Sequence, residues 1–316
     1  MKWTPFPVAL AAVMLLGACS DDKQAASDTS PASVAVTTPA SVAVTTPDPA
    51  TSNTSTFPVP SGIVSLSPTA TEMLFAIGAG AQVAAVDDQS NYPPEALQKP
   101  HDLSGLEPNV EAIAALKPDL VVIADDFTGL TKQLEALGLR VWSGGAATTF
   151  GDIYDQIEQL GALTGHVADA AAVVLKMQTD IAAAVKDAPK PANPLTYYHE
   201  IDTTYYSITE NTFIGQVYSL FGLQSIADLQ EVDSDYPQLS AEAVISANPD
   251  FIFLADGGFG ESPETVAARP GWGSLKAVTN GNVVVVDGDT SSRWGPRIVD
   301  YIEAVSAAVA KVAVSG

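Results

Sequence analysis

The stretch Glu111-Ala-Ile-Ala-Ala-Leu-Lys-Pro-Asp-Leu-Val-Val-Ile-Ala-Asp125 says most about the architecture, because a second copy follows 131 residues later. That copy is Glu242-Ala-Val-Ile-Ser-Ala-Asn-Pro-Asp-Phe-Ile-Phe-Leu-Ala-Asp256. Each copy begins with an acidic residue, which the dipole favours in the first turn of a short helix. A proline then ends the helix, since the residue before proline avoids the α region. Four apolar residues follow and predict a parallel strand buried on both faces. The repeat therefore predicts two similar α/β lobes.

The composition indicates a globular protein that does not bind nucleic acid. The chain has 316 residues, of which 47% are hydrophobic and 16% charged, so it can bury substantial cores. Its 37 Asp and Glu residues against 14 Lys and Arg give a formal charge of −23. Nucleic-acid phosphates need a basic surface, so this balance argues against such a partner. It fits a neutral or cationic ligand better than a polyanion.

The N-terminus carries a leader with the chain's single cysteine. Met1-Lys2 is weakly basic, and Val8 to Leu16 forms an apolar segment too short to span a bilayer. The following Leu16-Gly17-Ala18-Cys19 resembles the lipobox of bacterial lipoproteins. We expect residues 1–19 to be a lipoprotein signal peptide and Cys19 to be lipidated. More than one acyl chain on Cys19 would anchor the protein stably to the membrane. We therefore expect an extracytoplasmic protein, located on the outer face of the cell membrane or in the periplasm.

Residues 20–60 have the composition of a disordered tether. Ser, Thr, Pro and Ala dominate, and the octapeptide that begins at Ser33 recurs almost unchanged at Ser41. Such a segment cannot bury enough surface to offset its ordering entropy. Its prolines favour an extended spacer between membrane and globular part.

The rest of the chain divides into two lobes and a connector. We expect an N-terminal α/β lobe at 61–165, a connecting helix at 166–188 and a C-terminal α/β lobe at 189–316. The connector is predicted because Val167 to Val185 is Ala-rich and lacks Gly and Pro. Within the first lobe, Thr69 is the expected N-cap of a helix, with Glu72 as its capping-box partner.

A series of motifs then resembles one family. Ile63-Val-Ser-Leu-Ser-Pro-Thr-Ala-Thr-Glu-Met-Leu-Phe-Ala-Ile-Gly78 is similar to the opening of the class III substrate-binding proteins of ABC importers, which serve cobalamin, ferric siderophores and haem. Further matching motifs follow in the same order, and they are Ser90-Asn-Tyr-Pro-Pro94, Pro108-Asn-Val-Glu-Ala-Ile113, Lys117-Pro-Asp-Leu-Val-Val122, Ala268-Arg-Pro-Gly-Trp272, Asn280-Gly-Asn-Val283 and Gly295-Pro-Arg-Ile298. The likeness spans about residues 60 to 312.

The resemblance implies a fold, a function and partners. It implies two Rossmann-like α/β lobes bridged by one long rigid helix, with the ligand held between them. It also implies a monomeric extracytoplasmic binding protein that delivers its ligand to a permease dimer with ATPase subunits. In the family, the glutamates at the positions of Glu111 and Glu242 dock onto permease arginines. A surface-anchored scavenging or adhesion lipoprotein that works without a permease is the alternative.

The ligand is expected at the carboxyl ends of the strands, where open α/β sheets bind their ligands. The candidate cleft residues are Gln89, Asn91, Tyr92, Asp126, Phe127, Glu200, Tyr205, Tyr206, Phe259, Arg293 and Trp294. Two alternatives stay open at this point. Tyr205 and Tyr206 either stack on the ligand or fill the core, and Arg293 either binds a ligand group or pairs with Asp287 or Asp289.

Neither a resident metal nor catalysis is predicted. The chain has only three histidines, and His199-Glu-Ile-Asp202 alone offers too few converging ligands for a zinc site. No nucleophile elbow, Walker loop or His-Glu-x-x-His motif occurs, so we expect no enzyme and no cofactor, although a glycosidase-like carboxylate pair stays possible.

The ligand class follows from charge. A strongly anionic catecholate siderophore would need a cluster of cations, and the chain has only four arginines. The remaining ligand classes are a corrinoid and a hydroxamate-type complex. The cobalamin-type proteins carry an aromatic residue in the loop before Tyr-Pro-Pro, where this chain has Asp88-Gln89, so the resemblance does not choose between these ligands.

Overall fold

The computed structural model describes residues 58–189 and 193–315, with the side chains of α11 described as far as residue 312. The expected signal peptide, Cys19 and nearly all of the tether lie outside the described residues. Within them, no helix is long and apolar enough to cross a membrane.

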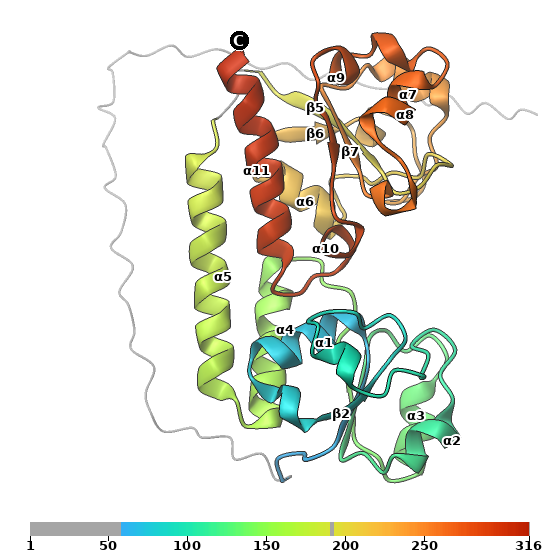
Figure 1. Ribbon diagram of the computed structural model, residues 1–316, viewed down its shortest axis with the longest axis vertical. Helices are drawn as coiled ribbons and strands as arrows, with labels where there is room; N and C mark the ends of the chain where they lie inside the picture. The colour runs from blue at the N-terminus through green and yellow to red at the C-terminus, as the bar shows by residue number, and fades with distance from the viewer. Residues whose placement is uncertain (1–57, 190–192, 316) are drawn as a thin grey trace, which may run out of the picture. The chain divides into compact units, whose positions relative to one another are not determined.

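Two four-stranded parallel sheets form the framework (Figure 1). The first has the order β2-β1-β3-β4 and the second the order β6-β5-β7-β8, so the connectivity is repeated. The first sheet comprises β1 (Ile63–Leu66), β2 (Val83–Val86), β3 (Leu120–Ile123) and β4 (Val141–Ser143). The second comprises β5 (Leu195–Glu200), β6 (Leu223–Ser225), β7 (Phe251–Leu254) and β8 (Val283–Val285). The predicted pair of α/β lobes is confirmed.

The helices follow the strands in the same alternation. The first lobe contains α1 (Pro68–Ala76), α2 (Val110–Ala115), α3 (Leu130–Ala136) and α4 (Phe150–Thr164). The second contains α6 (Phe213–Ser219), α7 (Ala241–Ala247), α8 (Pro263–Ala268), α9 (Lys276–Thr279) and α10 (Gly288–Ser292). The long α5 (Val167–Asp187) joins the lobes, and α11 (Ile298–Ser315) packs back along it, with Ser306 Oγ donating to the Ala184 carbonyl.

The two sequence copies take the same local structure. β3 and β7 are buried along their whole length, as the apolar runs predicted. The residues before the two prolines, Lys117 and Asn248, both adopt positive φ, so neither helix continues into its proline. The aspartate after each proline then accepts hydrogen bonds from the start of the neighbouring strand. Asp119 accepts from Ser61 and Gly62, and Asp250 accepts from Thr196.

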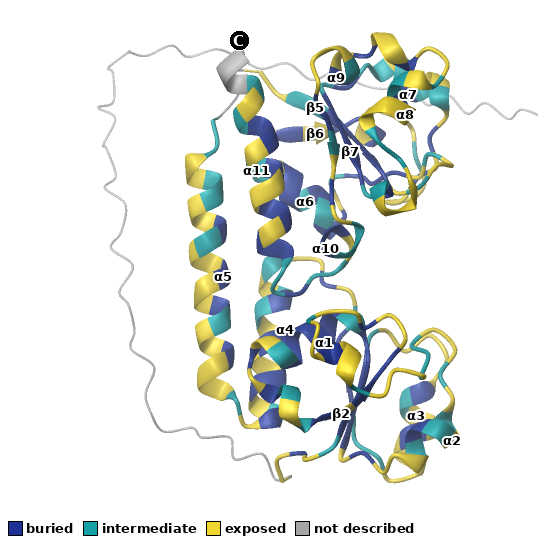
Figure 2. Ribbon diagram, in the orientation of Figure 1, coloured by how far each residue is buried: buried dark blue, intermediate teal, exposed yellow. Residues whose placement is uncertain are grey.

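The buried side chains explain why the lobes form one unit. One hydrophobic cluster includes residues from the first sheet, from α4, α5 and α11, and from the second sheet. The opposite face of each sheet has its own smaller cluster. Figure 2 shows dark, buried strands in both lobes, while α5 exposes its outer face. The helical layer is therefore shared, whereas the outer cores are separate.

The predicted cap of α1 is wrong. Ser67 is the N-cap, and its Oγ accepts from the Ala70 N–H at 3.2 Å. Pro68 occupies the first helical turn, where its missing N–H costs nothing, so the cap moves to the residue before it. Glu72 makes no capping box. It is buried and pairs with two arginines from beyond the second sheet.

Candidate functional site

A pocket of about 660 Å³ lies at the carboxyl ends of the second sheet. Its walls come from the ends of β5 and β7 and from the loop and helix α10 that follow β8. The lining residues are His199, Ile201, Ile208, Ile214, Tyr236, Ala255, Gly258, Phe259, Asp287, Gly288, Asp289, Ser291 and Ser292. The volume suits a ligand of drug size or a segment of a larger one.

Two exposed aromatic rings border this pocket. Phe259 has 92% of its surface exposed and ends a short turn after β7, and Tyr236 is 53% exposed. Gly257 permits this turn, because a Cβ there would lie 2.3 Å from Val285 Cγ1. Such rings lose little entropy when they stack on a ligand. Sequence reasoning found Phe259 but missed Tyr236, which lies eleven residues beyond β6. Its signal was an aromatic residue inside an acidic run, Asp233 to Asp235.

The polar wall of the pocket is acidic or neutral. The Asp287 carboxylate caps α10 by accepting from the Thr290 N–H at 2.8 Å. Asp289 accepts from Arg293 and from Asn91, both at 2.8 Å. Ser291 and Ser292 donate their hydroxyl protons to the Gly288 carbonyl. The lining residues include no lysine or arginine, so the pocket offers no cation to an anionic ligand.

Glu200 does not present its carboxylate to a ligand. It is fully buried and receives two bonds of 2.6 Å from Arg269, which also binds Glu261 at 2.6 Å. The Arg269 guanidinium lies 4.7 Å from the Trp272 ring, on which Tyr205 stacks with a centroid distance of 5.6 Å. Glu200 and Tyr205 thus belong to one structural cluster with Arg269 and Trp272. For Tyr205 this fits the alternative that the ring packs in the core.

Asp256, at the end of the second sequence copy, is buried beside this cluster. Neither of its carboxylate oxygens has a hydrogen-bond partner among the described residues. Burial, followed by the negative charge of Glu200, raises the pKa of Asp256 to about 6. The carboxyl group therefore takes up a proton in a pH range where an ordinary aspartate is ionised.

A second ion cluster connects the two lobes. Glu72 on α1 accepts from Arg293 at 3.0 Å and from Arg297 Nε at 2.9 Å. Arg293 also donates to Asn91 at 2.7 Å and to the Gln89 carbonyl at 3.2 Å. The structure therefore brings the predicted residues Gln89, Asn91 and Arg293 together, but they satisfy one another. Arg293 pairs with Asp289, which is one of the two alternatives left open above.

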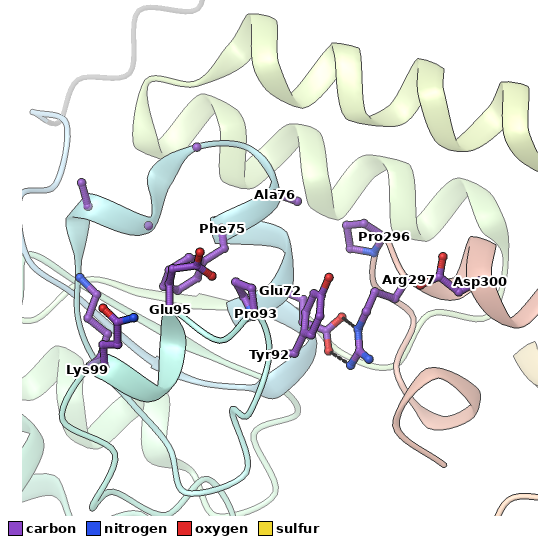
Figure 3. Close-up of a pocket in the computed structure, with 14 residues that line it drawn as sticks. Glu72, Phe75, Ala76, Tyr92, Pro93, Glu95, Lys99, Pro296, Arg297 and Asp300 are labelled. Atoms are coloured by element: carbon purple, nitrogen blue, oxygen red, sulfur yellow. Dashed lines mark hydrogen bonds and ion pairs between the residues drawn. The ribbon is translucent and has the colours of Figure 1, made fainter. Parts of the chain in front are cut away.

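Tyr92 lines a different pocket, of about 860 Å³, beside α1 and the start of α11. Its ring covers the Arg297 guanidinium at 4.1 Å, and a cis peptide bond joins it to Pro93. Figure 3 shows the Tyr92 ring beside Arg297, whose guanidinium is bonded to Glu72. Tyr92 is thus separated from the pocket bordered by Phe259.

The remaining candidates are dispersed. Phe127 is 90% exposed in the loop after β3, whereas Asp126 accepts from the first N–H groups of α3. Trp294 donates to Gln156 on α4 and packs against the shared core. Tyr206 is partly exposed and bridges to Gln238. Tyr197 and Tyr198 are fully buried, as expected for structural residues.

Glu111 and Glu242 occupy equivalent, exposed positions. Each is the second residue of its helix, α2 or α7, directly after a side-chain N-cap, Asn109 or Ser240. Neither forms an ion pair within the described residues. Each lobe therefore exposes an unpaired acid at the start of the equivalent helix, α2 or α7. No group of metal-ligating side chains occurs in residues 58–189 and 193–315.

Comparison with known proteins places these features in one family. Residues 63–290 match the model described as "Periplasmic binding protein". The chain is 29% identical over 262 residues to the ABC transporter substrate-binding lipoprotein YvrC of Bacillus subtilis, covering 79% of this chain and 80% of that protein. It is 33% identical over 250 residues to a cobalamin-binding protein of Halobacterium salinarum, covering 76% of this chain and 67% of the relative.

A solved structure supports the same placement. The periplasmic vitamin B12-binding protein of Vibrio cholerae matches with a TM-score of 0.67 and 27% identity, covering 81% of this chain and 99% of that one. Its likeness includes both lobes. The family match, the relatives and the repeated sheet order agree, and the chain belongs to the periplasmic binding protein family.

Proposed function

We propose that this chain is the substrate-binding protein of an ABC importer and that it binds an uncharged metal complex of the corrinoid or ferric hydroxamate kind. The observation that carries the ligand class is the 660 Å³ pocket, which combines exposed aromatic rings with a wall free of cations. Relatives described as cobalamin-binding support the corrinoid alternative.

Arginine side chains that are already paired with carboxylates support an uncharged ligand. Arg269, Arg293 and Arg297 each bind at least one carboxylate. A catecholate siderophore would have to break these pairs before it could use them. Freeing a partner from a buried ion pair costs about 3–5 kcal/mol, which would offset much of the gain.

A binding titration tests the ligand class. The probes are cobinamide, cyanocobalamin, a ferric trihydroxamate, haem and a ferric catecholate. We expect binding of a corrinoid or the trihydroxamate, and a loss of roughly 30-fold or more when Phe259 and Tyr236 are both changed to Ala, because each ring contributes about 1–2 kcal/mol. Leu175→Ala on the outer face of α5 is the control for removing an exposed apolar side chain. Tight binding of the catecholate alone would contradict the proposal.

Delivery to a permease is the second part of the proposal. Glu111 and Glu242 would meet basic residues of the permease, one from each lobe, and rim charges of this kind mainly set orientation and association rate. The test is uptake by cells carrying the Glu111→Ala/Glu242→Ala variant, with Glu135→Ala/Glu264→Ala as control because those acids are also exposed, one per lobe. Normal uptake by the first variant would reject the docking role and favour scavenging without a permease.

The proposal also covers location and chemistry. The protein would act as a monomer, anchored through Cys19, and would release its ligand unchanged. Recovery of a modified ligand after incubation with purified protein would contradict the last point and indicate an enzyme.

A further inference from the structure

A chain of three buried polar side chains ends at the 660 Å³ pocket. Tyr301 on α11, Tyr218 on α6 and His199 on β5 each expose no more than 2% of their surface. The Tyr301 and Tyr218 hydroxyls are hydrogen-bonded to each other, and Tyr218 Oη lies 2.8 Å from His199 Nδ1. His199 is also one of the residues that line the pocket. The three side chains therefore link the C-terminal helix to the ligand-binding pocket.

The direction of the hydrogen bonds follows from counting protons. Within the described residues, Tyr301 Oη has no partner besides Tyr218. If the Tyr301 proton goes to Tyr218, the Tyr218 proton goes to His199 Nδ1, and every hydroxyl proton has an acceptor. The reverse direction would leave the buried Tyr301 proton without one, which is the costly case. The first arrangement makes Nδ1 an acceptor.

The tautomer of His199 is fixed as a result. A neutral imidazole carries one proton, and when Nδ1 accepts, that proton resides on Nε2. Burial lowers the pKa of His199 to about 4, so the ring is neutral at physiological pH. No hydrogen bond engages Nε2 within the described residues, and it is not among the buried polar atoms without a partner. Nε2–H is thus the donor that His199 has left to offer the pocket.

We propose that His199 Nε2–H donates a hydrogen bond to an uncharged carbonyl oxygen of the bound ligand, and that Tyr218 and Tyr301 hold the imidazole in the tautomer this requires. The inference rests on the proposed function, which it makes more specific. An amide side chain of a corrinoid and the carbonyl of a hydroxamate share this acceptor chemistry. A carboxylate is disfavoured, because Asp287 and Asp289 line the same pocket.

The tautomer can be measured without any ligand. Protein labelled with ¹⁵N in its imidazole rings gives ring signals from only three histidines, and the His199→Gln variant assigns the pair that belongs to His199. At neutral pH we expect the chemical shifts of the Nε2–H tautomer. A dominant Nδ1–H tautomer would overturn the inference while leaving the proposed function intact.

Ligand binding tests the donor itself. In His199→Asn the amide takes the place of Nδ1, so the contact with Tyr218 can persist while the donor at Nε2 is lost. In His199→Gln the amide reaches the position of Nε2 and can still donate. With cobinamide and a ferric trihydroxamate as separate arms, we expect His199→Asn to weaken binding roughly three- to tenfold and His199→Gln to weaken it less. Circular dichroism and the thermal midpoint confirm that both variants are folded.

The outcomes separate the two proposals. Equal affinity of His199→Asn and wild-type protein for every ligand bound would overturn the inference. So would a change in the visible spectrum of the metal centre that depends on His199, since that would show coordination through an unprotonated Nε2. If wild-type protein bound neither cobinamide nor the trihydroxamate, the ligand class of the proposed function would be wrong, whatever tautomer the NMR spectrum showed.

Discussion

Replacing Glu72 by glutamine should destabilise the protein strongly, although the change alters a single heavy atom. The Glu72 side chain is 2% exposed and is the shared carboxylate of Arg293 and Arg297. The Glu72→Gln variant would keep the shape of the side chain but not its charge, so two guanidinium groups would lose their common counter-ion. Removing one partner of a buried ion pair costs about 3–5 kcal/mol.

Other contacts of the two arginines reduce this cost. Arg293 would keep its bonds to Asp289 and Asn91, and Arg297 is 16% exposed and stacks against Tyr92. We therefore expect a loss of about 2–4 kcal/mol in the free energy of unfolding for Glu72→Gln. The pair Glu72→Met with Arg297→Met should cost less than Glu72→Gln alone, because no unpaired Arg297 charge is left behind.

Urea denaturation at neutral pH, followed by circular dichroism, measures this difference. Glu135→Gln is the matched control, an exposed acid on α3 whose substitution should change the unfolding free energy by less than about 0.5 kcal/mol. The predicted loss should also persist in high salt, since screening acts weakly on buried charges. A loss below about 1 kcal/mol for Glu72→Gln would refute the reasoning that this cluster stabilises the contact between the lobes.

Three further predictions concern other charged groups and the leader. The pKa of Asp256 is raised to about 6, so the wild-type protein loses stability as the pH rises from the ordinary aspartate range through that value. The free energy of unfolding of Asp256→Asn should therefore increase by about 1 kcal/mol relative to that of wild type between about pH 5 and pH 7.5. A difference between the two proteins that does not change with pH would contradict this. Arg269→Lys should lose about 2–3 kcal/mol of stability, because an ammonium cannot replace the bidentate contact to Glu200, and a thermal midpoint like that of wild type would refute the assignment. Cys19→Ala should abolish incorporation of labelled fatty acid and release the protein from the membrane fraction, and retention there would argue against the lipid anchor.

The repeat was sufficient to predict the architecture, because its signals are local. A helix-start acid, a proline and a run of four apolar residues each influence the backbone only within a few residues along the chain. Two copies of that pattern imply two similar sheets. The exposed acids Glu111 and Glu242 followed from the same local reasoning. So did Phe259, which lies in the turn after a buried strand.

The partners of charged and polar side chains were decided only by the tertiary structure. Glu72 fits the pattern of a capping box, yet its carboxylate meets arginines more than 200 residues away, on the chain that follows the second sheet. Tyr236 and His199 reach one pocket because the loop after β6, the end of β5 and α10 converge there, and Tyr301 on the last helix is linked to His199 through the Tyr218 hydroxyl. Hydrogen bonds and ion pairs act over a few ångströms in space, so their partners depend on the path of the whole chain, whereas strands and helix ends depend on their immediate neighbours in the sequence.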